Sequence, residues 1–362
     1  SLTYNANVRT SGLRLGSIMR QPDQFGSITG SFSFNGKGVT PDAINTKFSG
    51  NIGSFGYNRY QYRNIKLNGS LAGNVFNVNA DINDPNADLN LVASGNFSDN
   101  PSFRINGMID SVKTMPLNFT PDPMIFRGKI DGTVSNITAD HMDADVLITD
   151  ALLVSNNDRL PLDSIQLLAG RTDTANYITL RSDIANVNIT GQYRLSELGS
   201  IIQNTIQPYF SVTPPAAAPA LQPYDFRFNA DIVYTPILSS FVPGLETMET
   251  IHAEGRFATG TGMNALVTTP YILFNGNAIN NLNLTAHTGD SGLVVQGNIA
   301  RIQSGNSFDI YNTRVNATAL NNQINFSLGI DDQNARNKYY LSGLLTQPQT
   351  GTYSLSLNPD SL

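Results

Sequence analysis

Histidines and paired carboxylates are the residues of this chain that could do chemistry, but their spacing is poor for it. His141, His252 and His287 stand far apart, and only His141 has a carboxylate nearby in sequence, in Asp143. A lone His-x-Asp on a sheet surface is typical of a solvated pair rather than of a metal centre. No G-x-S-x-G motif marks a nucleophile, although a Ser-His-Asp triad assembled across distance would leave no such motif. We expect no enzyme active site, no metal and no other cofactor.

Two acidic segments match metal-binding or acid-base patterns only in part. The run Asp84-Pro85-Asn86-Ala87-Asp88 matches the first ligands of a calcium loop, but the central glycine is missing and Gly95 stands where a bidentate Glu is needed. Paired carboxylates occur as Asp331 and Asp332, in another polar stretch. We interpret both segments as turns between strands.

The composition narrows the partners of this chain of 362 residues. Only 14% of the residues are charged and the net charge is -6, with no cluster of Lys and Arg. Nucleic acid and acidic membrane surfaces are disfavoured, because both attract basic patches. Cysteine is absent, which excludes disulfides and thiolate sites. We find neither an apolar run of about 18 residues nor a signal peptide at Ser1. The chain starts and stops in mid-pattern, so we expect it to be an excerpt of a longer protein.

A unit that recurs along the chain is its strongest pattern. Each copy opens with Asn or Ser, continues as an alternating apolar segment, passes through turn residues and ends in a second alternating segment. Such a repeat with one apolar face must stack on its neighbours to bury that face. The copies start at Asn64, Ser164, Asn281 and Asn312.

This alternation predicts the fold class. Phe76, Val78, Ala80 and Ile82 alternate with polar residues, which is typical of a strand with one face in water. Asn-Gly, Asn-Asn and Gly-Asp steps between the strands suit tight hairpins. We predict an all-β protein in which an elongated, repetitive antiparallel sheet curls into an open U-shaped groove, with one or two short amphipathic helices.

Two segments interrupt the strand pattern. Residues 196–210 show helical spacing, with Ser196 as the expected N-cap and Pro208 as the stop. A shorter helix is expected over residues 235–242, with Thr235 as N-cap. Both helices are expected to cover part of the apolar face, and the first could instead be a movable plug or a docking helix.

A Pro/Ala-rich stretch is expected to divide the chain. Residues 214–223 cannot pair centrally in a sheet, because proline lacks the amide hydrogen. We predict one β-groove module over residues 1–213, a linker or surface crossing over 214–223, and a second β-groove module over 224–362.

The long apolar face is the part of the chain left to explain a function. A sheet of about twenty strands at roughly 4.8 Å spacing is too long for one ordinary core. It could close as a barrel, face a second sheet in a sandwich or solenoid, or form an open trough. An open trough would need acyl chains or a partner to fill it, because soluble proteins rarely expose large apolar patches.

The sequence also resembles a known family. The run YQYRNIKLNGSLAGNVFNVNADINDPNADLNL from Tyr60, the helical segment from Ser196 and the closing YSLSLNPDSL are similar to the middle portion of TamB-type proteins of the AsmA-like superfamily, in the Bacteroidetes style. The resemblance implies a periplasmic β-groove, in a protein anchored in the inner membrane, that moves phospholipid to the outer membrane. It also implies, as a further partner, an outer-membrane barrel of the TamA or BamA kind.

The predicted function is therefore that of a periplasmic lipid-transfer segment whose partner is phospholipid or another acyl-chain lipid. The alternatives are a scaffold for assembly of outer-membrane proteins, working with an Omp85-type barrel, and a β-sandwich or solenoid module for adhesion or interaction. By the resemblance, the groove-lining role falls on Phe32, Phe34, Ile65, Leu67, Leu71, Phe76, Val78, Ile82, Leu89, Leu91, Phe103, Ile105, Val187, Ile189, Phe226, Phe228, Leu293, Val295, Ile324, Phe326 and Leu328.

Overall fold

The structure, a computed structural model, confirms the all-β prediction. It describes residues 2–40, 43–136, 140, 142–155, 158–210, 221–305, 308–349 and 352–358. All strand pairs with a described register are antiparallel. The described residues also form three short helices and one 3₁₀ turn.

The chain divides into two compact units. Unit 1 comprises Ser1–Thr138, Met142–Ala169 and Arg181–Asp183, and unit 2 comprises Ala139–His141, Gly170–Leu180 and Ile184–Leu362. The predicted first module, residues 1–213, thus contains unit 1 and the beginning of unit 2. Most of the predicted linker lies outside the described residues.

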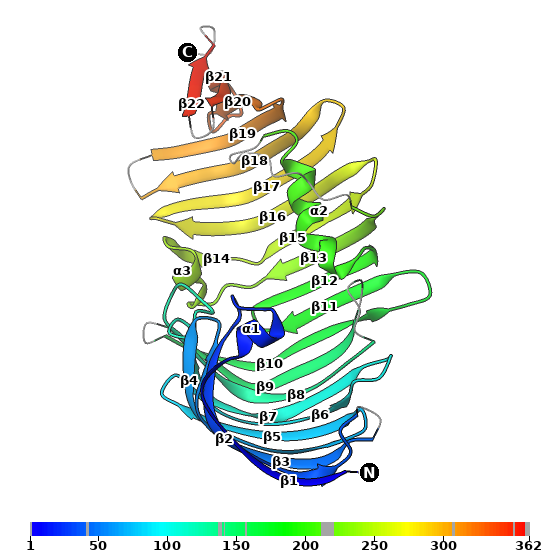
Figure 1. The fold of residues 1–362 in the computed structure, drawn as a ribbon. Coiled ribbons are helices and arrows are strands. Elements are labelled where there is room, and N and C mark those ends of the chain that lie inside the picture. Colours follow the sequence, from blue (N-terminus) through cyan, green and yellow to red (C-terminus); the bar gives the residue numbers. More distant parts are fainter. Residues whose placement is uncertain are drawn as a thin grey trace. The chain divides into compact units, whose positions relative to one another are not determined.

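Unit 1 is a ladder in which each strand pairs with the next along the chain, as Figure 1 shows from blue to green. Its elements are β1 (Thr3–Arg14), α1 (Leu15–Met19), β2 (Phe25–Lys37), β3 (Asn45–Tyr57), β4 (Tyr60–Ala72), β5 (Val75–Asp84), β6 (Ala87–Asn96), β7 (Ser102–Lys113), β8 (Met124–Ser135), β9 (Asp143–Ser155) and β10 (Asp158–Arg171).

Unit 2 repeats this plan, except that β14 and β15 both pair with β16. Strand β11 (Asn176–Ser182) falls across the division between the units. The other elements are β12 (Ala185–Gln192), the 3₁₀ turn Leu195–Glu197, α2 (Leu198–Ile206), β13 (Asp225–Ile232), α3 (Leu238–Phe241), β14 (Leu245–Met248), β15 (Ile251–Ala258), β16 (Gly262–Phe274), β17 (Asn277–Gly289), β18 (Gly292–Ser304), β19 (Phe308–Leu320), β20 (Gln323–Asp331), β21 (Asn337–Gln349) and β22 (Thr352–Leu357).

Alternation along the strands of unit 1 builds continuous apolar rows across them. Two rows cross all ten strands from β1 to β10 without a polar or charged side chain, and we call them rows A and B. Row A consists of Val8, Phe32, Gly50, Leu67, Ala80, Leu91, Gly107, Ile130, Ile148 and Ile165, and row B of Ala6, Phe34, Phe48, Gly69, Val78, Ala93, Ile105, Gly132, Val146 and Leu167.

Unit 2 carries two corresponding rows, C and D. Row C consists of Ile189, Phe228, Gly255, Ala265, Ala286, Val295, Ala317, Phe326, Gly343 and Leu357, and row D of Val187, Ala230, Ala253, Val267, Leu284, Gly297, Val315, Leu328 and Leu341.

Glycines in these rows make room for aromatic rings on neighbouring strands. A Cβ added to Gly255 would come within 2.7 Å of the ring of Phe228, and one added to Gly50 within 2.9 Å of the ring of Phe32. The rings therefore lie along the sheet and cover its backbone, a known way of pairing glycine in sheets.

The Asn residues that open the repeats lie within strands, not in hairpin turns. Asn64, Asn281 and Asn312 have positive φ angles of 53°, 50° and 46°. Each is the fifth residue of its strand, and the pairing register skips it. The register is the same on both sides of Asn64 and Asn281, so these residues interrupt the alternation without a β-bulge, whereas the pairing of β19 with β20 shifts at Asn312. Asn tolerates the left-handed conformation that such a position needs. Three copies form the predicted hairpins, β4–β5, β17–β18 and β19–β20.

The predicted helices are shorter than expected. A 3₁₀ turn leads into α2, which ends at Ile206, two residues before Pro208. Ser196 is not an N-cap, because Glu197 holds that position and makes no side-chain capping bond. The second helix is the single turn α3, and its N-cap position is Ile237 rather than Thr235.

Candidate functional site

The apolar face of unit 1 contains a pocket of about 510 Å³, which we call the unit 1 pocket. It is contributed by strands β2 to β7 and the loop after β7, and all of its lining residues are aliphatic or aromatic. They are Ile28, Ile52, Phe55, Tyr57, Tyr62, Ile65, Leu67, Ala80, Ile82, Ala87, Leu89, Leu91, Val112, Leu117 and Phe119.

Directly opposed aliphatic residues form the floor of this pocket. Ile52, Ile65, Ile82 and Leu89 are successive partners on the neighbouring strands β3 to β6. Ile52 and Ile65 are buried and belong to one core cluster. Its other buried members are Ile28, Tyr62, Ala87 and Leu117. Burial of such side chains stabilises the sheet by about 1.5–3 kcal/mol each.

The loop between β7 and β8 covers one end of the pocket. Its Leu117 is 1% exposed and packs into the core cluster, whereas Phe119 is 53% exposed. The loop is attached to the β3–β4 turn, because the side-chain amide of Asn58 donates to the Leu117 carbonyl at 3.1 Å. The amide of Asn118 donates back to the Asn58 carbonyl at 3.0 Å.

A buried carboxylate lies beside the pocket. Asp84 accepts hydrogen bonds from the Tyr60 hydroxyl at 2.6 Å and from the Arg63 and Asn86 amides at 2.8 and 2.9 Å. Burial, with the charge of Asp84 as a second cause, raises the pKa of Tyr62 to about 12. Its hydroxyl therefore stays neutral at ordinary pH. The run 84–88 contains the two-residue hairpin turn between β5 and β6, in which Asp84 pairs with Ala87.

Twelve of the predicted groove residues lie on the apolar rows, and two others, Leu293 and Ile324, are both partners of Ala319. Rows A and B contain Phe32, Leu67, Leu91, Phe34, Val78 and Ile105, and rows C and D contain Ile189, Phe228, Val295, Phe326, Val187 and Leu328. Five line the unit 1 pocket: Ile65, Leu67, Ile82, Leu89 and Leu91. Leu71, Phe76 and Phe103 lie toward the opposite ends of the strands, where Phe76 stacks on Phe97 with ring centroids 4.9 Å apart.

Sequence reasoning missed the pocket residues of β3 and β4 that precede the interruption at Asn64. Tyr62 and Ile65 are three residues apart, so unbroken alternation would place them on opposite faces. Both line the same pocket, because the left-handed conformation of Asn64 shifts the alternation by one residue. The signal in the sequence for this shift was the Asn at the fifth position of the strand, because Asn tolerates a positive φ angle. Leu117 and Phe119 lie in a loop and left no periodic signal.

In unit 2 the helix α2 covers part of the apolar face. Ile201 has no exposed surface and packs in a cluster with Tyr193, Phe226 and Phe257. Figure 1 shows α2 crossing the strands of this unit. The helix thus packs on the sheet, as one of the two predictions for it required, and the predicted groove residue Phe226 is buried beneath it.

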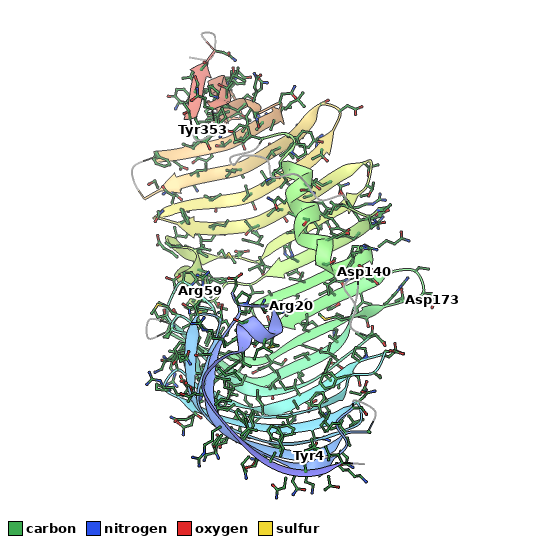
Figure 2. All side chains as sticks on the ribbon, in the orientation of Figure 1. Tyr4, Arg20, Arg59, Asp140, Asp173 and Tyr353 are labelled. Carbon is green, nitrogen blue, oxygen red and sulfur yellow. The ribbon has the colours of Figure 1, made fainter. Side chains whose placement is uncertain are left out.

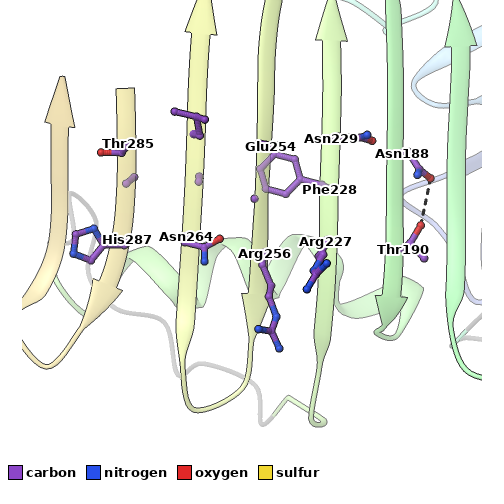
Figure 3. Close-up of a pocket in the computed structure, with 14 residues that line it drawn as sticks. Asn188, Thr190, Arg227, Phe228, Asn229, Glu254, Arg256, Asn264, Thr285 and His287 are labelled. Carbon is purple, nitrogen blue, oxygen red and sulfur yellow. Dashed lines mark hydrogen bonds between the residues drawn. The ribbon is translucent and has the colours of Figure 1, made fainter. Parts of the chain in front are cut away.

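The polar face of unit 2 has a hollow of about 740 Å³. Figure 3 shows Thr190, Arg227, Arg256 and His287 there, on strands β12, β13, β15 and β17. Arg256 forms an ion pair with Asp225, in which Nε donates to a carboxylate oxygen at 2.7 Å. Side chains project from both faces of the strands (Figure 2). The face that carries this hollow is lined mainly by polar and charged side chains.

The candidate chemical residues are not assembled into a centre. His252 on β15 pairs with Asp231 on the adjacent strand β13, with Nδ1 2.6 Å from Oδ1. The sequence did not reveal this carboxylate partner. His141 lies outside the described residues. Asp331 forms an ion pair with Arg314, with Nη2 at 2.9 Å, whereas Asp332 accepts from the amides of its own turn. Among the residues the structure describes, no group of three His, Asp or Glu could hold a metal.

Within the described part of the chain, no helix has the length and hydropathy needed to cross a membrane. The chain matches no protein-family model, no curated protein and no solved structure.

Proposed function

We propose that unit 1 binds the acyl chains of lipids along its apolar face, as part of a periplasmic lipid-transfer protein of the TamB type. The observation that carries this proposal is the continuity of rows A and B, which cross ten strands without a polar side chain. At roughly 4.8 Å between strands, the rows extend over about 43 Å.

The chemistry of the face suits hydrocarbon better than a polar ligand. The unit 1 pocket offers about 510 Å³ within aliphatic and aromatic walls, a volume typical of small-molecule sites. Each methylene transferred from water contributes about 0.8 kcal/mol and needs no directional contact. A chain could therefore shift along the rows without breaking hydrogen bonds, which favours transfer over fixed binding.

The proposed setting follows the sequence resemblance. Phospholipid would be carried between the inner and outer membranes, with membrane attachment through segments outside this chain. A TamA- or BamA-type barrel is a proposed protein partner on the same basis.

A matched pair of substitutions on β6 tests acyl-chain binding. Leu91 lines the unit 1 pocket, whereas the adjacent Val92 is 46% exposed on the opposite face. We expect Leu91→Asp to weaken binding of fluorescent palmitate by about tenfold or more, because a carboxylate is costly in an apolar site. Val92→Asp should bind like the wild type.

Mass spectrometry of the purified protein provides the second arm. Lipid should copurify with the wild type and with Val92→Asp, and less with Leu91→Asp. The proposal would be contradicted if the delipidated wild type stays soluble and monomeric and does not bind palmitate. Equal palmitate binding by Leu91→Asp and Val92→Asp would also contradict it.

A further inference from the structure

Helix α2 is an insertion that the sheet of unit 2 does not need. Gln192 at the end of β12 pairs directly with Asp225 at the start of β13. The two strands therefore already meet as a hairpin, for which a loop of two to five residues is usual. Residues 193–224 replace such a loop, and α2 lies within them.

The surface under α2 has the chemistry of the unit 1 pocket. Row C residues Ile189 and Phe228 pack against the cluster that holds Ile201. The same cluster includes Leu198 on the helix and Met263 on β16. Aliphatic and aromatic side chains of successive strands thus form both surfaces, and an apolar helix face occupies the one in unit 2.

Polar attachments hold α2 mainly near its ends. The Glu197 carboxylate accepts from the Gln222 amide at 3.2 Å, and Arg194 lies 3.2 Å from Asp140. Beyond the helix, the Tyr209 carbonyl accepts from the Asn322 amide at 3.0 Å. Between these points the described contacts of α2 with the sheet are apolar. A nine-residue helix is unstable alone in water, so α2 depends on this packing.

We propose that the sheet face beneath α2 is a second acyl-chain site and that α2 is its built-in occupant, displaced when the acyl chain of a lipid binds. This inference rests on the proposed function of unit 1. Helix and acyl chain compete for the same rows, so the apparent affinity of this site is its intrinsic affinity multiplied by the fraction of time that the helix is undocked.

Adjacent isoleucines provide a matched pair of variants. Ile201 is fully buried against the sheet, whereas Ile202 is 47% exposed. Ile201→Asp should release α2, and Ile202→Asp places the same charge on the same helix without disturbing the contact. Each is combined with Leu91→Asp, which disables the unit 1 pocket.

Fluorescent palmitate is the probe. The Leu91→Asp/Ile201→Asp protein should bind it about tenfold or more tightly than Leu91→Asp/Ile202→Asp, because the competing helix is gone. In the wild type, palmitate should increase hydrogen exchange of the α2 amides. Equal binding by both double variants, with unchanged exchange in α2, would overturn the inference.

A second variant guards against misfolding of Ile201→Asp. Residues 193–224 are replaced by Asn-Gly, which suits a two-residue hairpin between β12 and β13. In the Leu91→Asp background, palmitate binding by this protein supports the inference, and absence of binding overturns it. If the wild type binds palmitate but the helix-free protein gains nothing, only the second site fails. If no protein binds, the proposed function fails as well.

Discussion

Asn58 and Asn118, sixty residues apart in sequence, exchange hydrogen bonds between their side-chain amides and main-chain carbonyls, at 3.0 and 3.2 Å. Both residues have positive φ angles, 50° and 61°. The pair connects the β3–β4 turn to the loop that holds Leu117 over the unit 1 pocket. The main-chain amide of Asn58 also donates to the Gln24 carbonyl at 2.9 Å. Three connections on one side of unit 1 thus meet at Asn58.

We expect Asn118→Gly to loosen this loop. Glycine keeps the positive φ, so the substitution removes the amide contact without backbone strain. The free energy of unfolding should fall by about 1 kcal/mol, and hydrogen exchange should rise in residues 114–119. A double-mutant cycle with Asn58→Gly should give a coupling of about 0.5 kcal/mol or more. Additive effects of the two changes would show that the amide pair does not hold the loop.

The left-handed position of Asn64 should tolerate glycine but not a β-branched residue. Asn64→Val forces valine into the left-handed region and should lower the free energy of unfolding by about 1–3 kcal/mol. Asn64→Gly should cost little, and Asn68→Val, on the same strand in extended conformation, serves as the control. Urea unfolding curves measure all three. Equal stability of the valine and glycine variants at position 64 would mean that the left-handed conformation there is not required.

Alkaline pH should destabilise unit 1 through Tyr62. Burial raises the pKa of this phenol to about 12 in the folded protein, whereas an unfolded tyrosine has a pKa of about 10. The unfolded state therefore loses its proton first. The stability contributed by neutral Tyr62 is complete below pH of about 10 and is lost as the pH rises toward 12.

The Tyr62→Phe variant provides the comparison for this pH effect. Its free energy of unfolding should fall less than that of the wild type over the same alkaline range, because phenylalanine has no proton to lose. Phenolate absorbance should also lack one late-titrating group. Parallel pH profiles of the two proteins would show that Tyr62 titrates as an ordinary surface phenol.

Local patterns in the sequence determined the fold class of this protein. Alternation around Phe76, Val78 and Ile82 depends on the two-residue period of a strand, which each segment carries within itself. Spacing of apolar residues and Pro208 likewise located α2, although not its first residue. The candidate groove residues were found by the same alternation, and most of them lie on an apolar row or line the unit 1 pocket.

Only the tertiary structure decided where the alternation shifts and what covers the apolar face. The sequence showed Asn64 as a repeat marker but did not show its positive φ angle. The pairing of β3 with β4 skips Asn64, and only this interruption places Tyr62 in the pocket. Leu117 and Ile201 cover sheet residues distant in sequence, so no periodic pattern revealed their partners. The physical reason is that strand period is a local property, whereas register, bulges and coverage arise from contacts between distant segments.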